Sequence, residues 1–151
     1  MKFLTCIFAI SFTISLSCKA AIVIYVGLFV ESSESSVPQI YDSFRRSLLS
    51  LGNIIVTNKR PYEEGIYVFV QPIRGAKGNL LGYSLAVTST TSLAVLSGAM
   101  PDIQETRELY RSTSLQFVPV NEIYSVAAGI VGKLDKEQIE PDRRLLSRIS
   151  S

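Results

Sequence analysis

Two apolar runs near the start of the chain are separated by a single lysine, Lys19. The first extends from Phe3 to Leu16, and the second, IVIYVGLFV, covers residues 22–30. The second run is rich in β-branched residues and has no polar interruption, which is typical of a strand buried on both faces of a sheet. Gly27 within it indicates a position where a helix packs closely against the sheet. The pattern therefore predicts a first strand that is covered on both sides.

A helical pattern follows this strand. Between Val37 and Leu51, apolar residues recur every three or four positions, and polar residues fill the opposite side. Ser36 and Gln39 match a capping box, and Gly52 supplies a stop signal. The chain is therefore predicted to form a helix after its first strand.

Strand patterns occupy the middle of the chain. NIIVTNK, from residue 53, is short, whereas residues 65–73 and 79–91 form two longer candidates. The segment RGAKG joins these two, and its glycines predict a hairpin connection. Periodicity leaves residues 92–100 open between a further strand and an irregular apolar segment.

The last third of the chain contains one short strand and one clear helix. Residues 101–111 are polar, and their pattern does not decide between a helix and a long surface excursion. The sequence SLQFVPV, residues 114–120, predicts a short strand. An apolar stripe over residues 123–134, with Asn121 as the cap, predicts the closing helix. The RRLLSR stretch near the end fits a frayed terminus better than a short basic amphipathic helix.

The order of these elements is strand, helix, three strands, an uncertain segment, strand and helix. This order predicts an α/β (α+β) fold in which two main helices pack on a mixed sheet, with a third layer left open. A length of 151 residues favours one domain. We therefore expect a signal peptide at residues 1–20, a single α/β domain at 21–136 and a charged C-terminal tail at 137–151.

The N-terminal segment is typical of a secretory signal peptide. Lys2 begins it, the first apolar run follows, and Cys18 and Ala20 are small residues suited to a cleavage site after Ala20. Lys19 interrupts the apolar stretch before it reaches the roughly 20 residues that a spanning helix needs. Lipid attachment at Cys18 and an uncleaved membrane anchor stay open as alternatives. We therefore expect a periplasmic or secreted protein that touches a membrane only through this segment, if it is uncleaved or lipidated.

Cleavage changes the charge and the thiol content of the mature domain. Both cysteines, Cys6 and Cys18, lie in the removed part, so the mature domain has no disulfide or thiol chemistry. Loss of Lys2 and Lys19 takes the 15 basic residues to 13, which equals the 13 acidic residues. A neutral domain gives no reason to expect nucleic acid as a partner.

The composition limits the chemistry that the chain can perform. It contains no histidine, which removes the commonest general base and a common metal ligand. A serine–lysine pair is the remaining nucleophilic arrangement, but no spacing singles one out. The available residues are Ser84, Ser89, Ser92, Ser97, Lys59, Lys77, Lys133 and Lys136.

Two pairs of carboxylates and one glycine-rich segment have structural interpretations. Glu63 and Glu64 lie in a turn beside Pro61 and Gly65, where solvated acids are expected. Glu31 and Glu34 precede the first helix, where they offset its dipole, although a ligand would sit in this loop if the sheet is open there. RGAKGN lacks the phosphate-loop spacing. We therefore predict no catalytic, cofactor-binding or metal-binding residues, and no cofactor.

Three sequence segments carry a resemblance to known proteins. ESSESSVPQIYDSFRRSL, GYSLAVT and NEIYSVAAGIV resemble segments of small exported proteobacterial proteins of unknown function, over residues 21–136. In layout the chain is also similar, more distantly, to the N-terminal α/β domain of TolB, although no propeller domain follows. The resemblance implies a periplasmic, non-enzymatic module and supplies no functional residues.

These observations favour a periplasmic binding or envelope-assembly module without catalytic activity. Its expected partner is an unidentified protein of the cell envelope. Two alternatives stay open. One is a small envelope enzyme that uses a serine–lysine or carboxylate pair, and the other is a membrane-tethered accessory protein.

Overall fold

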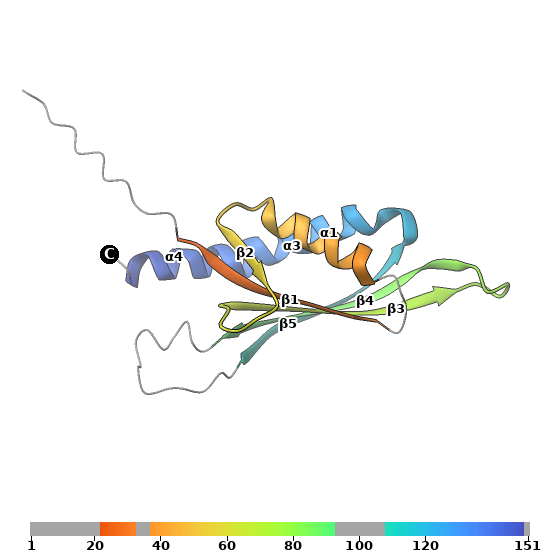
Figure 1. Cartoon of the computed structure of the whole chain (residues 1–151), viewed down its shortest axis with the longest axis horizontal. Helices are drawn as coiled ribbons and strands as arrows, with labels where there is room; N and C mark the ends of the chain where they lie inside the picture. Colours follow the sequence, from red (N-terminus) through yellow and green to blue (C-terminus); the bar gives the residue numbers. More distant parts are fainter. Residues whose placement is uncertain (1–21, 33–36, 93–107, 150–151) are drawn as a thin grey trace, which may run out of the picture.

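The computed structural model describes residues 22–32, 37–92 and 108–149. They form one five-stranded sheet with helices on one side of it, as Figure 1 shows. The strands are β1 (Ile24–Ser32), β2 (Ile54–Thr57), β3 (Glu64–Arg74), β4 (Leu80–Ser92) and β5 (Glu108–Pro119). Their spatial order is β2-β1-β3-β4-β5. The α/β fold with a mixed sheet, predicted from the sequence, is confirmed.

The sheet mixes parallel and antiparallel pairing. β1 lies parallel to both β2 and β3, whereas β3, β4 and β5 pair antiparallel. The predicted hairpin joins β3 to β4: the Gly75 N–H donates to the Asn79 carbonyl at 2.8 Å, and the Gly78 N–H donates to the Gly75 carbonyl at 2.9 Å. Gly78 has a φ of 78°, which an L side chain rarely adopts.

The helices cover one face of the sheet. α1 (Val37–Leu49) packs beside α3 (Ile123–Leu134). A 3₁₀ turn, Val120–Glu122, precedes α3, and a π-helical stretch, Asp135–Ile139, leads from α3 into α4 (Glu140–Ile149). The core lies between these helices and the sheet, and its largest fully buried side chains include Phe44, Ile24, Leu28, Ile40, Leu48, Ile66 and Leu85.

The first strand differs from its prediction. Ile24, Val26 and Leu28 are buried under the helices, but Tyr25 on the other side is 42% exposed. β1 is therefore covered by helices on one face only, because the molecule has no second helical layer in the part that the structure describes. Gly27 is also not a helix contact, since the ring of Tyr62 lies over it.

Two further predictions are wrong in part. The sequence pattern of residues 101–111 predicts a helix or a surface excursion, but β5 begins at Glu108 and so includes the last residues of this segment. The terminus predicted to be frayed forms α4 over residues 140–149. An ion pair holds α4 to the sheet, because Nη2 of Arg111 in β5 lies 2.9 Å from Oδ1 of Asp142.

Some sequence predictions concern residues that lie outside the described part of the chain. These are the signal segment 1–20, Ser36 of the capping box and residues 93–100. None of the described helices is both long and apolar enough to cross a membrane.

Candidate binding surface on the open face of the sheet

The face of the sheet opposite the helices carries large apolar side chains in solvent. The strand register places Phe69 of β3, Ala86 of β4 and Leu115 of β5 side by side in one row. In the next row Phe117 lies opposite Ser84. Phe69 is 46% exposed, Leu115 is 73% exposed and Phe117 is 56% exposed. We call Phe69, Leu115 and Phe117 the open-face patch.

A shallow hollow of about 430 Å³ lies within this patch. Phe69 and Leu115 border it, and its other lining residues are Glu31, Ser32, Val70, Gln71, Ser84 and Ala86. The small side chains of Ser84 and Ala86 lie between larger neighbours on β3 and β5, so the surface is indented at β4. The indentation offers a partner a place to insert an apolar side chain.

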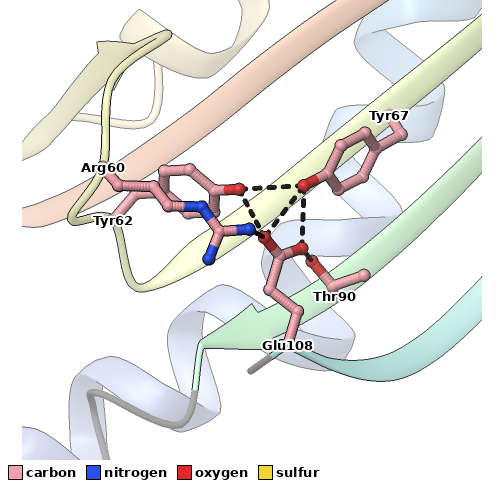
Figure 2. A network of polar contacts seen from close by, with 5 residues as sticks. All are labelled: Arg60, Tyr62, Tyr67, Thr90 and Glu108. Atoms are coloured by element: carbon pink, nitrogen blue, oxygen red, sulfur yellow. Dashed lines mark hydrogen bonds and ion pairs between the residues drawn. The ribbon is translucent and has the colours of Figure 1, made fainter. Parts of the chain in front are cut away.

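A polar network closes one end of the open face, as Figure 2 shows. At its centre is the carboxylate of Glu108, the first residue of β5. The carboxylate accepts hydrogen bonds from the Tyr62 hydroxyl at 2.5 Å, the Tyr67 hydroxyl at 2.8 Å and the Thr90 hydroxyl at 2.6 Å. Arg60 adds an ion pair. The network therefore ties the segment before β3 to β3, β4 and β5.

The electrostatics of this network keep Glu108 ionised and its tyrosines neutral. Burial acts to raise the pKa of Glu108, but hydrogen bonds from Thr90, Tyr62 and Tyr67 and the charge of Arg60 outweigh it, so the pKa is lowered. Burial, together with the hydrogen bond to Glu108, raises the pKa of Tyr62. Burial is also the largest cause of the raised pKa of Tyr67. Since four donors already occupy the carboxylate, its geometry fits a structural clamp better than a general base.

Two glycines leave the space next to the sheet that the side chains of the network occupy. A Cβ on Gly27 would lie 2.8 Å from the ring of Tyr62. A Cβ on Gly65, the neighbour of Gly27 in the register, would collide with the Thr90 hydroxyl and lie 3.2 Å from the Glu108 carboxylate. The absence of these side chains lets Tyr62 and Glu108 lie flat against the sheet.

A second acidic group lies on the helix-covered face. Glu64, the first residue of β3, is 2% exposed. The Thr91 hydroxyl donates to its carboxyl oxygens at 3.1 and 3.2 Å, and Arg111 Nη1 lies 4.0 Å away. Burial, followed by a hydrogen bond with the Asp142 carboxyl, raises the pKa of Glu64 to about 9. The raised pKa favours the protonated form of Glu64 at the junction of the sheet and α4.

The two acids that adjoin in the sequence have separate roles. Glu63 accepts a hydrogen bond from the Tyr25 N–H at 2.6 Å. Glu64 is not the solvated turn residue that its neighbours Pro61 and Gly65 predicted, because β3 begins at Glu64 and turns its side chain under the helices. In the other pair, Glu31 lines the hollow and Glu34 lies outside the described residues.

The serines and lysines of the hypothetical nucleophilic pair lie on different parts of the fold. Ser84 opens onto the hollow, Ser89 is buried with its hydroxyl 2.8 Å from that of Ser112, and Ser92 ends β4. Ser97 lies outside the described residues. The four lysines, Lys59, Lys77, Lys133 and Lys136, lie respectively after β2, in the hairpin, at the end of α3 and in the π-helical stretch.

Metal-ligating side chains do not gather in the described parts of the chain. Among residues 22–32, 37–92 and 108–149, no group of three or more His, Cys, Asp or Glu residues has an arrangement that could hold a metal ion. The open-face patch and the Glu108 network are the features that distinguish this face of the sheet. Sequence reasoning missed both, because their residues come from four separate segments.

Comparison with known proteins gives no family. No protein-family model and no curated protein matches the chain. Among solved structures, a PelC dodecamer from Paraburkholderia phytofirmans has a TM-score of 0.44 at 11% identity, covering 75% of this chain and 86% of that chain. A rare lipoprotein B from Shewanella oneidensis has a TM-score of 0.34 at 11% identity, covering 79% of this chain and 98% of that chain. At such low similarity these structures assign no function to this chain, and the resemblance to TolB stays a prediction.

Proposed function

We propose that this chain is an exported binding or assembly module of the bacterial cell envelope, without catalytic activity, whose open sheet face holds a protein partner. The observation that carries the proposal is the open-face patch. Phe69, Leu115 and Phe117 expose apolar surface on one face of the sheet, and Phe69 and Leu115 border a hollow. Contiguous exposed apolar surface of this kind marks interaction sites on soluble proteins.

The side chains around the patch suit a protein partner. The rows beside it carry neutral polar residues such as Thr88, Thr113 and Gln71. The centres of protein interfaces are rich in aromatic residues, and Phe69 and Phe117 supply two here. Glu31, which lies beside Phe69 in the register, is the acid that lines the hollow. Full burial of an exposed large apolar side chain is worth about 1.5–3 kcal/mol. The three side chains of the open-face patch are 46%, 73% and 56% exposed, so each would supply only part of that amount on binding.

Fixed side chains also favour binding. The Thr88 and Thr113 hydroxyls lie 2.9 Å apart across β4 and β5. The ring of Phe29 lies 5.7 Å from that of Tyr62, which the Glu108 network holds in place. A surface that is already ordered loses less conformational entropy when a partner binds.

A variant of Phe69 tests the proposed surface. Phe69→Thr removes the ring from a central strand and keeps a residue suited to strands. The control is Leu145→Gln, which changes an exposed leucine on α4. With a partner purified from the envelope, we expect Phe69→Thr to raise the dissociation constant at least tenfold and the control to leave it unchanged. Equal affinities for both variants would contradict the proposal.

The N-terminus of the protein made in the cell tests export and decides between the alternatives. We expect intact-mass analysis to give a chain that begins at Ala21. A lipid-modified Cys18 would support the membrane-tethered accessory protein instead, and a retained Met1 would support an uncleaved anchor. Loss of a cellular phenotype in a folded Glu63→Ala variant would favour the envelope enzyme.

A further inference from the structure

The two edges of the sheet differ in length. β2 forms one edge with only four residues, whereas β5 forms the other with 12 residues. β5 pairs with β4 on one side, so half of its backbone N–H and C=O groups point away from the sheet. A long edge strand of this kind is a template for a further strand.

Within β5, residues 112–118, STSLQFV, carry none of the charges, prolines or glycines with which proteins protect an edge. The register shift in the β4–β5 pairing lies at Ser89 and Thr90, before this segment. The segment also exposes Leu115 and Phe117. An uncharged, regular edge with exposed apolar side chains is suited to pair with a further strand.

A groove follows the same edge on the helix side. It has a volume of about 240 Å³ and lies between β5 and α3. Val126, Ile130 and Leu134 give it an apolar lining, and Lys133 and Glu137 are exposed beside them. Gly129 also lines it, and a Cβ there would meet no atom within 4 Å. The groove therefore has room for a helix to approach α3.

We propose that two copies of this chain pair antiparallel through β5, so that their sheets become continuous and the α3 helices come together over the joined edges. The two-fold axis of such a pair reverses the direction of one α3 relative to the other. Lys133 and Glu137 lie one turn apart beside the groove. A pair whose two-fold axis passes midway between them places each lysine opposite the glutamate of the second copy. This charge complementarity selects a second copy as the occupant of the groove.

The proposal stands independently of the partner on the open face. The residues that carry it, Ser112, Ser114, Gln116, Lys133 and Glu137, line the groove on the helix side. Pairing would place the Leu115 side chains of both copies on one continuous open face. The assembled pair would therefore present two open-face patches side by side.

A charge exchange in the groove tests the pairing. We expect the mature protein, processed from the full-length chain, to show a monomer–dimer equilibrium when sedimentation equilibrium is measured at several protein concentrations. We expect Lys133→Glu to raise the dimer dissociation constant at least tenfold, because it places two acids together at each contact. The double variant Lys133→Glu with Glu137→Lys should restore the wild-type value. Ser114→Lys, which puts a charge on the edge strand, should also weaken the dimer.

Other outcomes overturn the pairing. A monomer at every concentration, or an oligomer larger than a dimer, contradicts a two-fold pair. A dimer that Lys133→Glu leaves unchanged but Phe69→Thr dissociates would place the contact on the open face instead. Circular dichroism of each variant tests whether the fold is kept. Lys133 is an exposed helix residue, so its replacement should leave the core intact.

Discussion

The ring of Phe29 in β1 stacks on the ring of Tyr67 in β3, with centroids 5.0 Å apart and planes inclined by 14°. The hydroxyl of the same tyrosine donates to Glu108 at the start of β5. Tyr67 therefore joins Phe29 to the polar network, in which Figure 2 shows Tyr67 beside Glu108. This link explains how a face without a helical layer keeps a defined shape.

Glu108→Gln is expected to destabilise the fold. The amide cannot accept from all four donors or pair with Arg60, so buried hydroxyl groups lose their partner. We expect the free energy of unfolding at pH 7 to fall by about 1–3 kcal/mol, measured by urea denaturation. Glu31→Gln, on an exposed acid of β1, is the matched control. A loss no greater than that of the control would show that the network adds nothing to stability.

Stability should decline as the pH rises through the neutral range. The pKa of Glu64 is raised from 4.5 to about 9, so the unfolded chain releases this proton several pH units before the folded chain does. The contribution of Glu64 is therefore complete below pH 4.5 and is lost progressively up to about pH 9. The slope from this group is at most about 1.4 kcal/mol per pH unit.

Glu64→Gln isolates this effect. The amide keeps a donor for Asp142 and has no proton to release, so the variant should lose the decline between pH 5 and 9. Urea denaturation at a series of pH values measures it. On the acid side, the lowered pKa of Glu108 predicts stability that is present above pH 4.5 and lost as the pH falls through that pKa. A Glu64→Gln variant with the wild-type pH profile would show that Glu64 is ionised in the folded state.

Two glycines should respond in opposite directions to alanine. Gly27→Ala would place a Cβ 2.8 Å from the Tyr62 ring, which must move and pull on the Glu108 network. We expect a loss of about 1–3 kcal/mol. Gly132→Ala, in α3, meets no atom within 4 Å and should stabilise by about 0.5–1 kcal/mol. Thermal unfolding compares them, and equal effects would mean that Tyr62 does not lie against Gly27.

The sequence patterns predict where the helices and strands of this fold lie better than they predict which faces of these elements are buried. The apolar spacing of α1 and α3 and the hairpin at Gly75 and Gly78 follow from local physics, and the structure contains all three. The unbroken apolar run of β1 predicts a strand that is buried on both faces of the sheet. Its second face instead carries Tyr25 and Phe29, and an aromatic cluster on an open face gives the same sequence pattern as a second covering layer.

The candidate site could not be predicted because its contacts are distant in the sequence. The donors to Glu108 come from positions 60, 62, 67 and 90, and nothing near Glu108 distinguishes it from the other acids of its polar segment. The neighbours of Glu64 in the sequence likewise predict a turn. Its surroundings in the fold include Arg111 of β5, which pairs with Asp142 of α4, and both residues lie far from Glu64 in the sequence.

Site-specific photo-crosslinking in the cell tests the central claim that the open face holds a protein partner. A photoreactive amino acid replaces Phe69 on the open face in one variant and Arg45, an exposed residue of α1, in another. We predict a crosslink to a distinct envelope protein from position 69 and none from position 45. A crosslink from position 45 with none from position 69 would contradict the account, because the partner would then lie on the helical side.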